Sequence, residues 1–360
     1  MSDIEQKQTS KTAQRKRAFN LAGQSGYTVG LTGMGVLVAI IFLVINPSVY
    51  GSILNVQSIA FSVPEIAILA LAISVAMTTA GIDLSIVAVA NLASLFVAVI
   101  STYGATVGWT DFLTTLIAVG GALLIGAVCG AFNGFMVATF KITPILTTLA
   151  TMQVYSGIAI MATKGQAMYG STNILLSLGT ENLLGIPLVF WLFVLVTIMV
   201  AFIMSRTTFG VKITMMGSNP NASLFSGFRI PNLTIRTYLM TGILAAIAGI
   251  VMVSRTGAAS ASYGDSYLML AITIAVLGGV NPFGGKRAIG GAAIAALVLQ
   301  MISSGLNING ASPYIYQIIQ GLILAGATVV AFERRRHAQR AIRTKARLSA
   351  ADRKEAAINV

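Results

Sequence analysis

The sequence predicts an all-α polytopic membrane protein with about ten transmembrane helices and with both termini in the cytoplasm. Hydrophobic residues make up 56% of the 360 residues, and charged residues make up only 9%. Soluble domains carry about 25% charged residues, so a surface this poor in charge would not stay dissolved in water. The apolar residues also gather in long runs, whereas most basic residues gather at the two ends. These observations exclude a soluble enzyme and a disordered protein.

Five apolar runs fill the first half of the chain. A membrane helix needs about 20 residues to cross about 30 Å of hydrocarbon. The runs cover residues 30–45, 66–80, 84–101, 112–140 and 142–161. The run at 66–80 is short for a full span, which leaves a broken or re-entrant helix open there. In the fourth run, Gly126, Gly130 and Gly134 form a ridge of small residues on one face, so we expect close helix packing there.

Five more runs follow, and the distribution of charge supports their number. They cover residues 184–204, 237–254, 267–280, 288–304 and 313–332, of which 267–280 is again short. An even number of spans keeps both termini on the same side. Outside the tails, that side then holds seven Lys or Arg, and the opposite side holds only Lys164 and Arg255. The positive-inside rule favours this arrangement.

The formal net charge of +13 is concentrated in the two tails. Residues 1–17 contain five Lys or Arg, and residues 334–354 contain nine. Basic patches can indicate nucleic-acid binding, but cations that flank an apolar body favour anchoring at the cytoplasmic face. We therefore expect a polar and basic cytoplasmic tail at 1–29 without a cleavable signal peptide, a transmembrane domain at 30–332, and a basic cytoplasmic tail at 333–360.

Polar side chains near or inside the runs are candidates for a solute pathway. Asp83, in the turn at 79–85, either caps the following helix after Gly81 breaks the preceding one, or touches solute or holds a gate. Buried amides cost free energy unless they are paired, so each amide in a run either pairs with a neighbouring helix or binds solute. Amides in the runs are Asn91, Asn133, Gln153, Gln300, Gln317 and Gln320. Because amides donate and accept, and because no run carries Lys or Arg at mid-span, the set would suit a neutral polyhydroxylated solute. The candidate pathway residues are Asp83, Asn91, Gln153, Gln300 and Gln317.

The connection at 206–236 is the longest on the basic side. Asn219-Pro220 breaks the chain, residues 221–226 are able to form a short helix, and Gly227 would end it. If Phe225 and Phe228 are exposed, this helix is suited to docking a partner; a re-entrant or surface-lying loop is the alternative. The candidate docking residues are Gly217, Ser218, Asn219, Pro220, Ala222, Ser226, Gly227 and Phe228.

We expect no catalytic residues, metal site or cofactor on this chain. Residues 279–287 approach a phosphate-binding loop, but Val280 stands where that motif has its first Gly, and Arg287 replaces its Ser or Thr. His337 lies in the basic tail, where we expect it to be solvated. Cys129 is the single cysteine, so no disulfide can form within the chain.

Four segments match four sequence motifs that occur in the same order in one protein family. Residues 80–85 match G-G-I-D-L-S with Ala80 in place of the first Gly, and residues 142–152 match I-x-P-F-I-x-T-L-x-T-M. The inner connection matches T-x-F-G followed by G-x-N-x-x-A-A-x-x-S-G-I, and residues 278–285 match G-G-x-x-x-x-G-G. Over residues 60–332 the chain thus resembles the permease subunits of bacterial ABC importers for monosaccharides of the ribose/xylose/galactose type. It departs at 86–88, which replaces V-G-S, and at 266–271, which lacks both acids of G-Y-E-L-D-A.

This resemblance implies that the chain moves solute and that its energy comes from elsewhere. Two permease copies, or two related permeases, would form the pathway for a sugar or sugar-like neutral solute across the bacterial inner membrane. A separate cytoplasmic ATPase subunit would bind ATP and Mg²⁺ and grip residues 217–228, and an extracytoplasmic binding protein would deliver the sugar. The alternative is a self-contained secondary transporter coupled to protons or sodium, which would need mid-membrane carboxylates and a repeat between the halves. A membrane-embedded enzyme would instead need an acid–base constellation.

Overall fold

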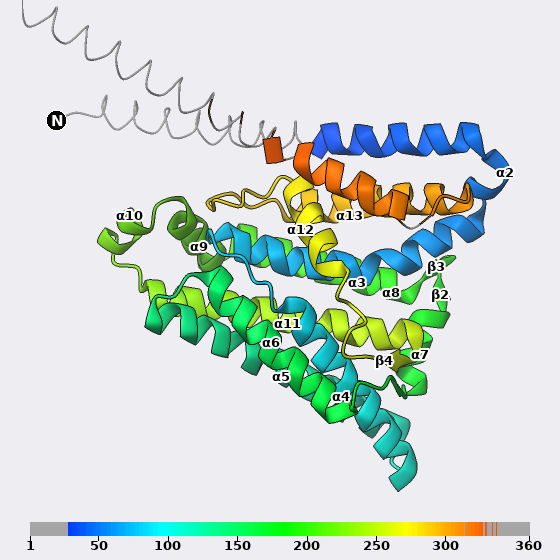
Figure 1. The fold of residues 1–360 in the computed structure, drawn as a ribbon, viewed down its shortest axis with the longest axis horizontal. Helices are drawn as coiled ribbons and strands as arrows, with labels where there is room; N and C mark the ends of the chain where they lie inside the picture. Colours follow the sequence, from blue (N-terminus) through cyan, green and yellow to red (C-terminus); the bar gives the residue numbers. More distant parts are fainter. Residues whose placement is uncertain (1–27, 313, 327, 330–332, 334–335, 337–360) are drawn as a thin grey trace, which may run out of the picture.

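The computed structural model describes residues 28–312, 314–326, 328–329, 333 and 336 as an elongated helical bundle (Figure 1). Within this part, eight helices are long and apolar enough to cross a membrane. They are Thr28–Ile45, α3 (Ile53–Thr78), α4 (Ile86–Val107), α5 (Asp111–Phe140), α6 (Pro144–Thr163), α8 (Leu188–Arg206), α11 (Ile230–Thr256) and α13 (Ile289–Ile308). Two shorter apolar helices, α12 (Tyr267–Leu277) and Tyr314–Gly326, complete the ten expected segments. An all-α polytopic membrane fold is confirmed.

Short elements close the two ends of the bundle. Helices α9 (Thr208–Ser218) and α10 (Pro220–Phe225) lie at the left end of Figure 1, which we call the inner end because it carries most of the basic residues between the tails. At the opposite, outer end lie α2 (Pro47–Tyr50), α7 (Asn173–Thr180) and two small antiparallel sheets. Strand β1 (Met168–Tyr169) pairs with β4 (Ala258–Ala259), and β2 (Asn182–Leu183) pairs with β3 (Ile186–Pro187).

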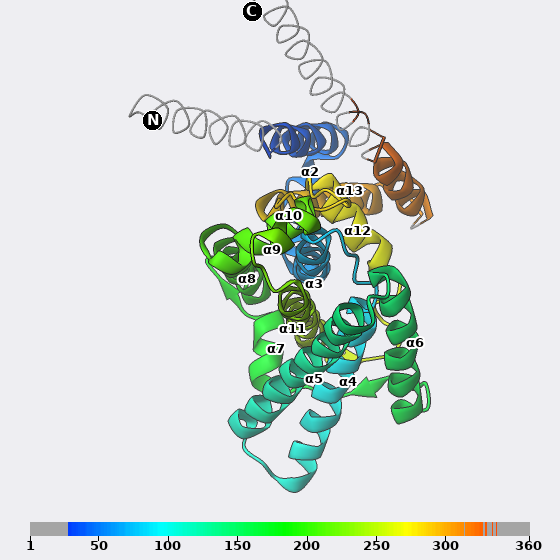
Figure 2. The same cartoon turned by 90° about the vertical axis from the view of Figure 1, so that its left-hand side faces the viewer.

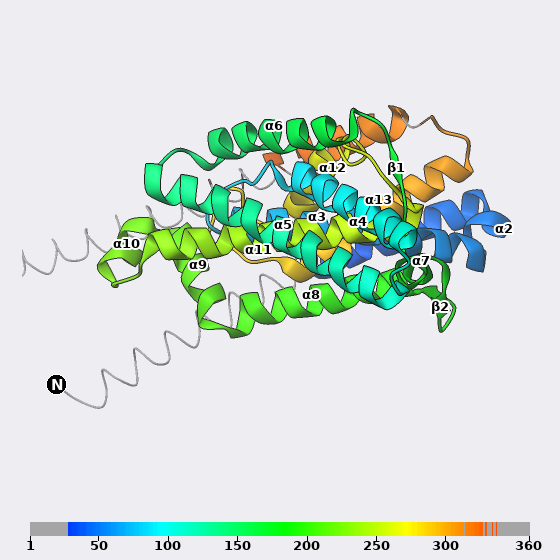
Figure 3. The same cartoon turned by 90° about the horizontal axis from the view of Figure 1, so that it is seen from below.

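Helix α3 is the centre of the core. Seen end-on in Figure 2, it is surrounded by α8, α11, α12 and α13, and it contacts each of them. Residues 67–78 of α3 are buried without interruption. Figure 3 shows α6 and α8 on opposite sides of the bundle, where both expose apolar side chains. A helical stretch that is apolar all round, as residues 66–73 of α3 are, belongs inside such a bundle.

Helices α5 and α11 approach each other through glycines. A Cβ at Gly126 would collide with the backbone of Gly242, and a Cβ at Gly130 would collide with the backbone of Tyr238. A Cβ at Gly134 would overlap Ile235. The ridge predicted on the fourth run therefore faces α11, and its missing side chains bring the two backbones together.

The structure corrects two predicted boundaries. Helix α3 begins at Ile53 rather than at residue 66 and is continuous for 26 residues, so the interpretation of 66–80 as a broken or re-entrant helix was wrong. Polar residues between 53 and 65 lower the hydropathy there, but Asn55 and Glu65 among them are buried by tertiary contacts; Ser304 Oγ, for example, donates to Asn55 Oδ1 at 2.5 Å. Helix α11 likewise begins at Ile230 rather than at residue 237.

The short helix α12 does not cross the bilayer. Its 11 residues extend about 16 Å, roughly half of the hydrocarbon thickness. The segment 257–266 leads into it and folds back into the bundle after α11 ends, so α12 starts within the fold. A broken span at 267–280, left open by the sequence, is what the structure shows. Most of the predicted tails at 1–29 and 333–360 lie outside the described residues, so those boundaries stay predictions.

Candidate functional site

A buried polar cluster surrounds Asp83 in the turn between α3 and α4. Asp83 is 1% exposed. Its Oδ1 accepts hydrogen bonds from the amide of Ser85 at 3.1 Å and from Ser85 Oγ at 2.7 Å, and its Oδ2 accepts from Thr241 Oγ1 at 2.6 Å. Burial raises the pKa of the Asp83 carboxyl above its ordinary value, although these hydrogen bonds act in the opposite direction. The carboxylate thus joins the turn to α11.

The cluster extends to two further helices. Asn133 Nδ2 on α5 donates to Ser85 Oγ at 2.7 Å, and Tyr155 OH on α6 donates to Asn133 Oδ1 at 3.1 Å. Both Asn133 and Tyr155 are buried. We call Asp83, Ser85, Asn133, Tyr155 and Thr241 the Asp83 cluster. Each carboxylate oxygen of Asp83 has a partner, and a satisfied buried network of this kind rigidifies the fold around it.

The local geometry of the turn differs from the prediction. Ser85, not Asp83, occupies the N-cap position of α4, and it makes no side-chain capping bond there. The chain reverses at Ala80, whose φ is 62°, a left-handed conformation that favours glycine. Gly81 is needed for space instead, because a Cβ there would lie 2.8 Å from Tyr238 OH. Asp83 therefore anchors the turn to distant helices rather than capping the next one.

Asn91 holds the segment that folds back before α12. Its Nδ2 donates to the carbonyl of Ala261 at 2.8 Å, and its Oδ1 accepts from the amide of Gly264 at 3.2 Å. The side chain is fully buried in α4. Of the two roles left open for this amide, pairing with a neighbouring element is the one that the geometry supports.

The predicted glutamines do not converge on one site. Gln153 and Gln317 are exposed, on α6 and on the helix Tyr314–Gly326, and Gln320 is half-buried. Gln300 on α13 lines a small cavity of about 10 Å³ between α3, α12 and α13, about the size of one water molecule. Only Asp83 and Asn133, among the predicted polar residues, belong to the same hydrogen-bonded network.

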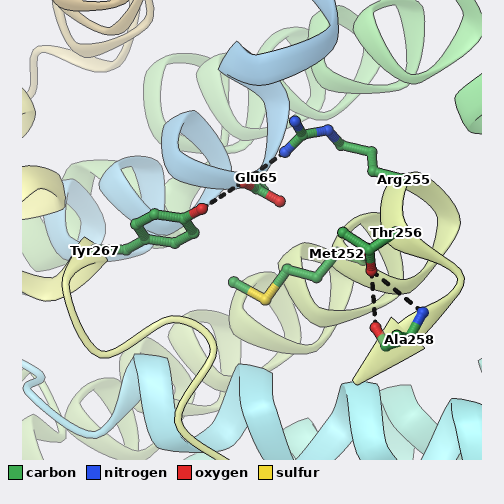
Figure 4. A network of polar contacts seen from close by, with 6 residues as sticks. All are labelled: Glu65, Met252, Arg255, Thr256, Ala258 and Tyr267. Carbon is green, nitrogen blue, oxygen red and sulfur yellow. Dashed lines mark hydrogen bonds and ion pairs between the residues drawn. The ribbon is translucent and has the colours of Figure 1, made fainter. Parts of the chain in front are cut away.

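A second buried polar cluster lies at the middle of α3, and the sequence analysis did not predict it. Glu65 Oε1 lies 2.5 Å from Arg255 Nη1 and accepts a hydrogen bond from Tyr267 OH at 2.8 Å (Figure 4). These residues come from the middle of α3, the last turn of α11 and the first residue of α12. The guanidinium of Arg255 also lies over the ring of Phe61, with its central carbon 4.3 Å from the ring centroid. We call Glu65, Arg255 and Tyr267 the Glu65 cluster.

The Glu65 cluster is charged, buried and incompletely hydrogen-bonded. The side chains of Glu65 and Arg255 are 3% and 9% exposed. Glu65 Oε2 and Arg255 Nε have no hydrogen-bond partner within the described part of the chain. Beside it, Thr256 Oγ1 lies 2.8 Å from the carbonyl oxygen of Ala258 and accepts a hydrogen bond from the amide of Ala258 at 3.3 Å, just after the end of α11 (Figure 4). Ionisable residues inside a membrane span usually mark functional positions.

This cluster corrects the predicted distribution of charge. Arg255 was assigned to the outer loop by its position, but it lies in the last turn of α11 and is paired with Glu65 inside the bundle. The sequence feature that could have indicated this cluster was Glu65 itself, an acidic residue beside Pro64 at the start of an apolar run. Its partner lies 190 residues away in the sequence, and no local pattern connects the two.

The inner connection folds into α9 and α10. Asn219 Oδ1 accepts from the amide of Ala222 at 3.0 Å and so caps α10, and Gly227 ends it with φ 77°. The predicted short helix is thereby confirmed, at Pro220–Phe225 rather than at 221–226. Phe225 at its tip is 91% exposed, whereas Phe228, also expected to be exposed, is half-buried beneath Lys212. A large apolar side chain projecting from the inner end is typical of a docking surface.

Helix α9 is packed directly onto the centre of the bundle. Gly217 at the end of α9 is buried, and a Cβ there would overlap the carbonyl of Thr78, the last residue of α3. The amide of Gly285, in the loop before α13, donates to the same carbonyl at 3.0 Å. The same loop packs on Ala80, since a Cβ at Gly284 would lie 2.8 Å from the Cβ of Ala80. The end of α9, the inner end of α3 and the Asp83 turn thus all pack on the loop before α13 or on one another.

A hollow of about 300 Å³ lies beside α10 and carries positive charge. Lys212, Arg229 and Arg236 line it together with Phe228. No carboxylate occurs among its described lining residues. The surface next to Phe225 is therefore suited to an acidic partner surface.

The chain matches one family model over most of its length. The model is described as "Branched-chain amino acid transport system / permease component", and it covers residues 55–328. That range includes the Asp83 cluster, the Glu65 cluster and helices α9 and α10.

Three relatives illustrate the similarity to known proteins. The ribose import permease protein RbsC of Bacillus subtilis (strain 168) is 32% identical over 300 residues, which cover 83% of this chain and 90% of the relative. The autoinducer 2 import system permease protein LsrD of Enterobacter sp. (strain 638) is 30% identical over 298 residues, covering 80% and 88%. LsrD of Escherichia coli (strain K12) is 28% identical over 308 residues, covering 83% and 90%. No solved structure gives a significant match.

Proposed function

This chain belongs to the permease-component family that its sequence matches over residues 55–328, and from that premise we propose that it is the membrane-embedded permease subunit of an ABC importer for a sugar or sugar-like neutral solute. It is a multi-pass membrane protein of an import system. The observation that carries the solute class is the near full-length similarity to permeases named for ribose and autoinducer 2 import.

In this proposal, other chains supply the energy for transport and deliver the solute. A cytoplasmic ATPase subunit would bind ATP and Mg²⁺, an extracytoplasmic binding protein would supply the sugar, and a second permease copy or paralogue would complete the pathway. The exposed Phe225 and the basic hollow beside it support an ATPase groove that is apolar in its centre and acidic at its edge. No step of ATP chemistry is assigned to this chain.

The packing of α9 suggests how the partner would act. A displacement of α10 would move Gly217, and the contact of Gly217 with Thr78 would pass that movement to the inner end of α3. Helix α3 also carries Glu65, which holds the α11–α12 junction through Arg255 and Tyr267. In this proposal α3 is the element that couples the inner docking site to the middle of the bundle, so that one rigid helix contributes to alternating access.

Reconstitution tests the function. The chain would be placed in proteoliposomes with its candidate ATPase subunit and binding protein, and uptake of radiolabelled D-ribose and other monosaccharides would be measured. We expect uptake only when ATP and both partners are present. Uptake by this chain alone, driven by a proton or sodium gradient, would refute the proposal in favour of a secondary transporter that uses the buried carboxylate of Glu65.

A pair of matched variants tests the docking helix. Phe225→Ser removes the exposed ring at the inner end, whereas Leu184→Ser removes a similarly exposed apolar side chain at the outer end. We expect Phe225→Ser to lower both capture of the ATPase subunit and uptake, and Leu184→Ser to change neither. Equal capture and equal uptake by the two variants would exclude α10 as the docking element.

A further inference from the structure

The segment 257–266, between α11 and α12, is non-helical backbone held inside the bundle. Asn91 on α4 hydrogen-bonds it at two points, and Tyr267, which follows it directly, donates to Glu65. Glu65 lies half-way along the 26-residue α3, so about 20 Å of helix separates it from either end. In Figure 1 the segment lies between α7 at the outer end and α9 at the inner end. Its last residues are therefore at the level of the hydrocarbon core.

Three polar side chains of this segment are exposed at that level, namely Ser262, Asp265 and Ser266. Asp265 makes no ion pair within the described part of the chain, and its Oδ1 lies 3.5 Å from Asn91 Nδ2. Ser266 occupies the N-cap position of α12 but makes no side-chain capping bond. Hydrocarbon offers no partner to a carboxylate or a hydroxyl, and at this depth irregular backbone and ionisable groups face protein or a water-filled cavity. This surface therefore does not face lipid.

Two aromatic rings belong to the same short stretch of chain. Tyr263 and Tyr267 are half-buried, and their rings meet edge to face with centroids 6.0 Å apart. Aromatic surface combined with a few polar groups is typical of small-molecule sites. The two oxygens of the Asp265 carboxylate are able to accept from two neighbouring hydroxyls, and a serine hydroxyl both donates and accepts. This combination suits a neutral polyhydroxylated solute, whereas Asp265 would repel an anion.

We propose that Ser262, Asp265 and Ser266 line the water-filled solute pathway and that Asp265 accepts hydrogen bonds from hydroxyl groups of the passing sugar. The identity of the solute rests on the proposed function, whereas contact with water follows from the depth and exposure of these residues. Asn91, whose amide is occupied by the backbone of the segment, positions Asp265 and does not bind solute. Sites formed where a membrane helix is interrupted near the middle of the bilayer are common in transporters.

Thiol accessibility tests for a water-filled surface without any solute. Ser262→Cys and Ser266→Cys, in the full chain in liposomes, would be treated on both sides with a membrane-impermeant methanethiosulfonate reagent that carries a trimethylammonium group. Both should react at least about 10-fold faster than Met199→Cys on the apolar outer side of α8, because apolar surroundings disfavour the reactive thiolate. The unmodified chain, whose single cysteine Cys129 is buried, is the baseline. Reaction at both serine positions as slow as at Met199→Cys would overturn the inference.

Uptake separates the pathway from any other water-filled surface. In the reconstituted importer, uptake of radiolabelled D-ribose and the other monosaccharides would be compared per inserted molecule. We expect Asp265→Asn to lower uptake by about 10-fold, the loss of roughly one hydrogen bond to a charged group, without shifting thermal unfolding. Glu181→Gln, at an exposed acid of the outer end, should leave uptake unchanged. The thiol reagent should stop uptake by Ser266→Cys but not by the unmodified chain.

The outcomes distinguish this inference from the proposed function. Normal uptake by Asp265→Asn, or by fully labelled Ser266→Cys, would overturn the inference while the unmodified chain still imports sugar. Absence of uptake by the unmodified chain with ATP and both partners would refute the proposed function. In that case thiol reactivity at Ser262→Cys and Ser266→Cys would still decide whether this surface is water-filled.

Discussion

The Asp83 cluster lies at the inner end of α3, and the Glu65 cluster lies at its middle. Both are buried, but they differ in how completely their hydrogen bonds are made. In the Asp83 cluster, three donors from Ser85 and Thr241 reach one carboxylate, and all of them are neutral groups. In the Glu65 cluster, a full ion pair is buried in the middle of a span, and Glu65 Oε2 and Arg255 Nε have no partner in the described structure.

The difference suggests separate roles for the two acids. A fully satisfied network has no lower-energy arrangement nearby, so it fixes one conformation. A buried charge pair with spare donors and acceptors is able to exchange partners, and it is strongly destabilised when one member is lost. Asp83 therefore anchors the inner turn, and Glu65 with Arg255 forms a junction that holds α3, α11 and α12 together.

The largest expected effect comes from removing one member of the ion pair. Arg255→Met leaves the Glu65 carboxylate buried with only Tyr267 as a donor, so we expect a loss of about 3–5 kcal/mol in unfolding free energy. The double variant Glu65→Leu, Arg255→Met removes both charges and should recover most of that loss. Chemical denaturation in detergent micelles would measure both.

Arg236→Met provides the control for this cycle. Arg236 is exposed on the same helix, so the same substitution there should change stability by about 0.5 kcal/mol or less. If Arg255→Met is no more harmful than Arg236→Met, or if the double variant is as unstable as the single one, the pair is not a junction of the fold.

Asp83→Asn should have a smaller effect on stability. The amide keeps one acceptor for Ser85 but turns a donor towards Thr241, whose hydroxyl is able to rotate and accept. We expect a loss of about 1–3 kcal/mol, together with lower uptake per inserted molecule, because the Asp83 turn packs on the loop at 284–285. Glu181→Gln, at an exposed outer position, is the control. Normal uptake per inserted molecule would restrict Asp83 to holding the turn.

Tyr267→Phe tests the neutral arm of the Glu65 cluster. It removes the hydrogen bond of 2.8 Å to Glu65 but leaves the ion pair, so we expect a loss of about 1 kcal/mol in unfolding free energy. Tyr169→Phe, on an exposed ring, should be neutral. A loss as large as that of Arg255→Met would mean that the hydroxyl, not the charge pair, holds the junction.

The helices were predictable because membrane spans are defined by composition alone. Runs of apolar residues located every long helix, and the boundary errors fell where polar residues lie inside a span. At the start of α3, Asn55 and Glu65 lowered the local hydropathy, and only their contacts with Ser304 and Arg255 show why they are tolerated there. Those contacts join segments far apart in the chain.

The two buried clusters were less predictable than the helices, because their contacts also join segments far apart in the chain. Asp83 and Asn219 occur in turns with local signals, and the sequence identified both. Arg255 has an ordinary local sequence at the end of a span, and its burial depends on how 257–266 folds back onto Asn91. Local patterns indicate which residue types are available, whereas the partners of a buried charge depend on tertiary packing.

The smallest expected effect is a gain, at the turn that the Asp83 cluster anchors. Ala80 has φ 62°, where a side chain costs free energy and glycine does not, so Ala80→Gly should stabilise the protein by about 0.5–1 kcal/mol. Ala150→Gly, at an exposed position within α6, should instead destabilise the protein by about 0.5–1 kcal/mol. Glycine has a lower helix propensity than alanine, because it loses more backbone entropy on folding. Thermal unfolding in detergent would compare the two. If both variants are destabilised, the turn relies on the contact between Ala80 and Gly284, and the anchor then includes packing as well as the hydrogen bonds of Asp83.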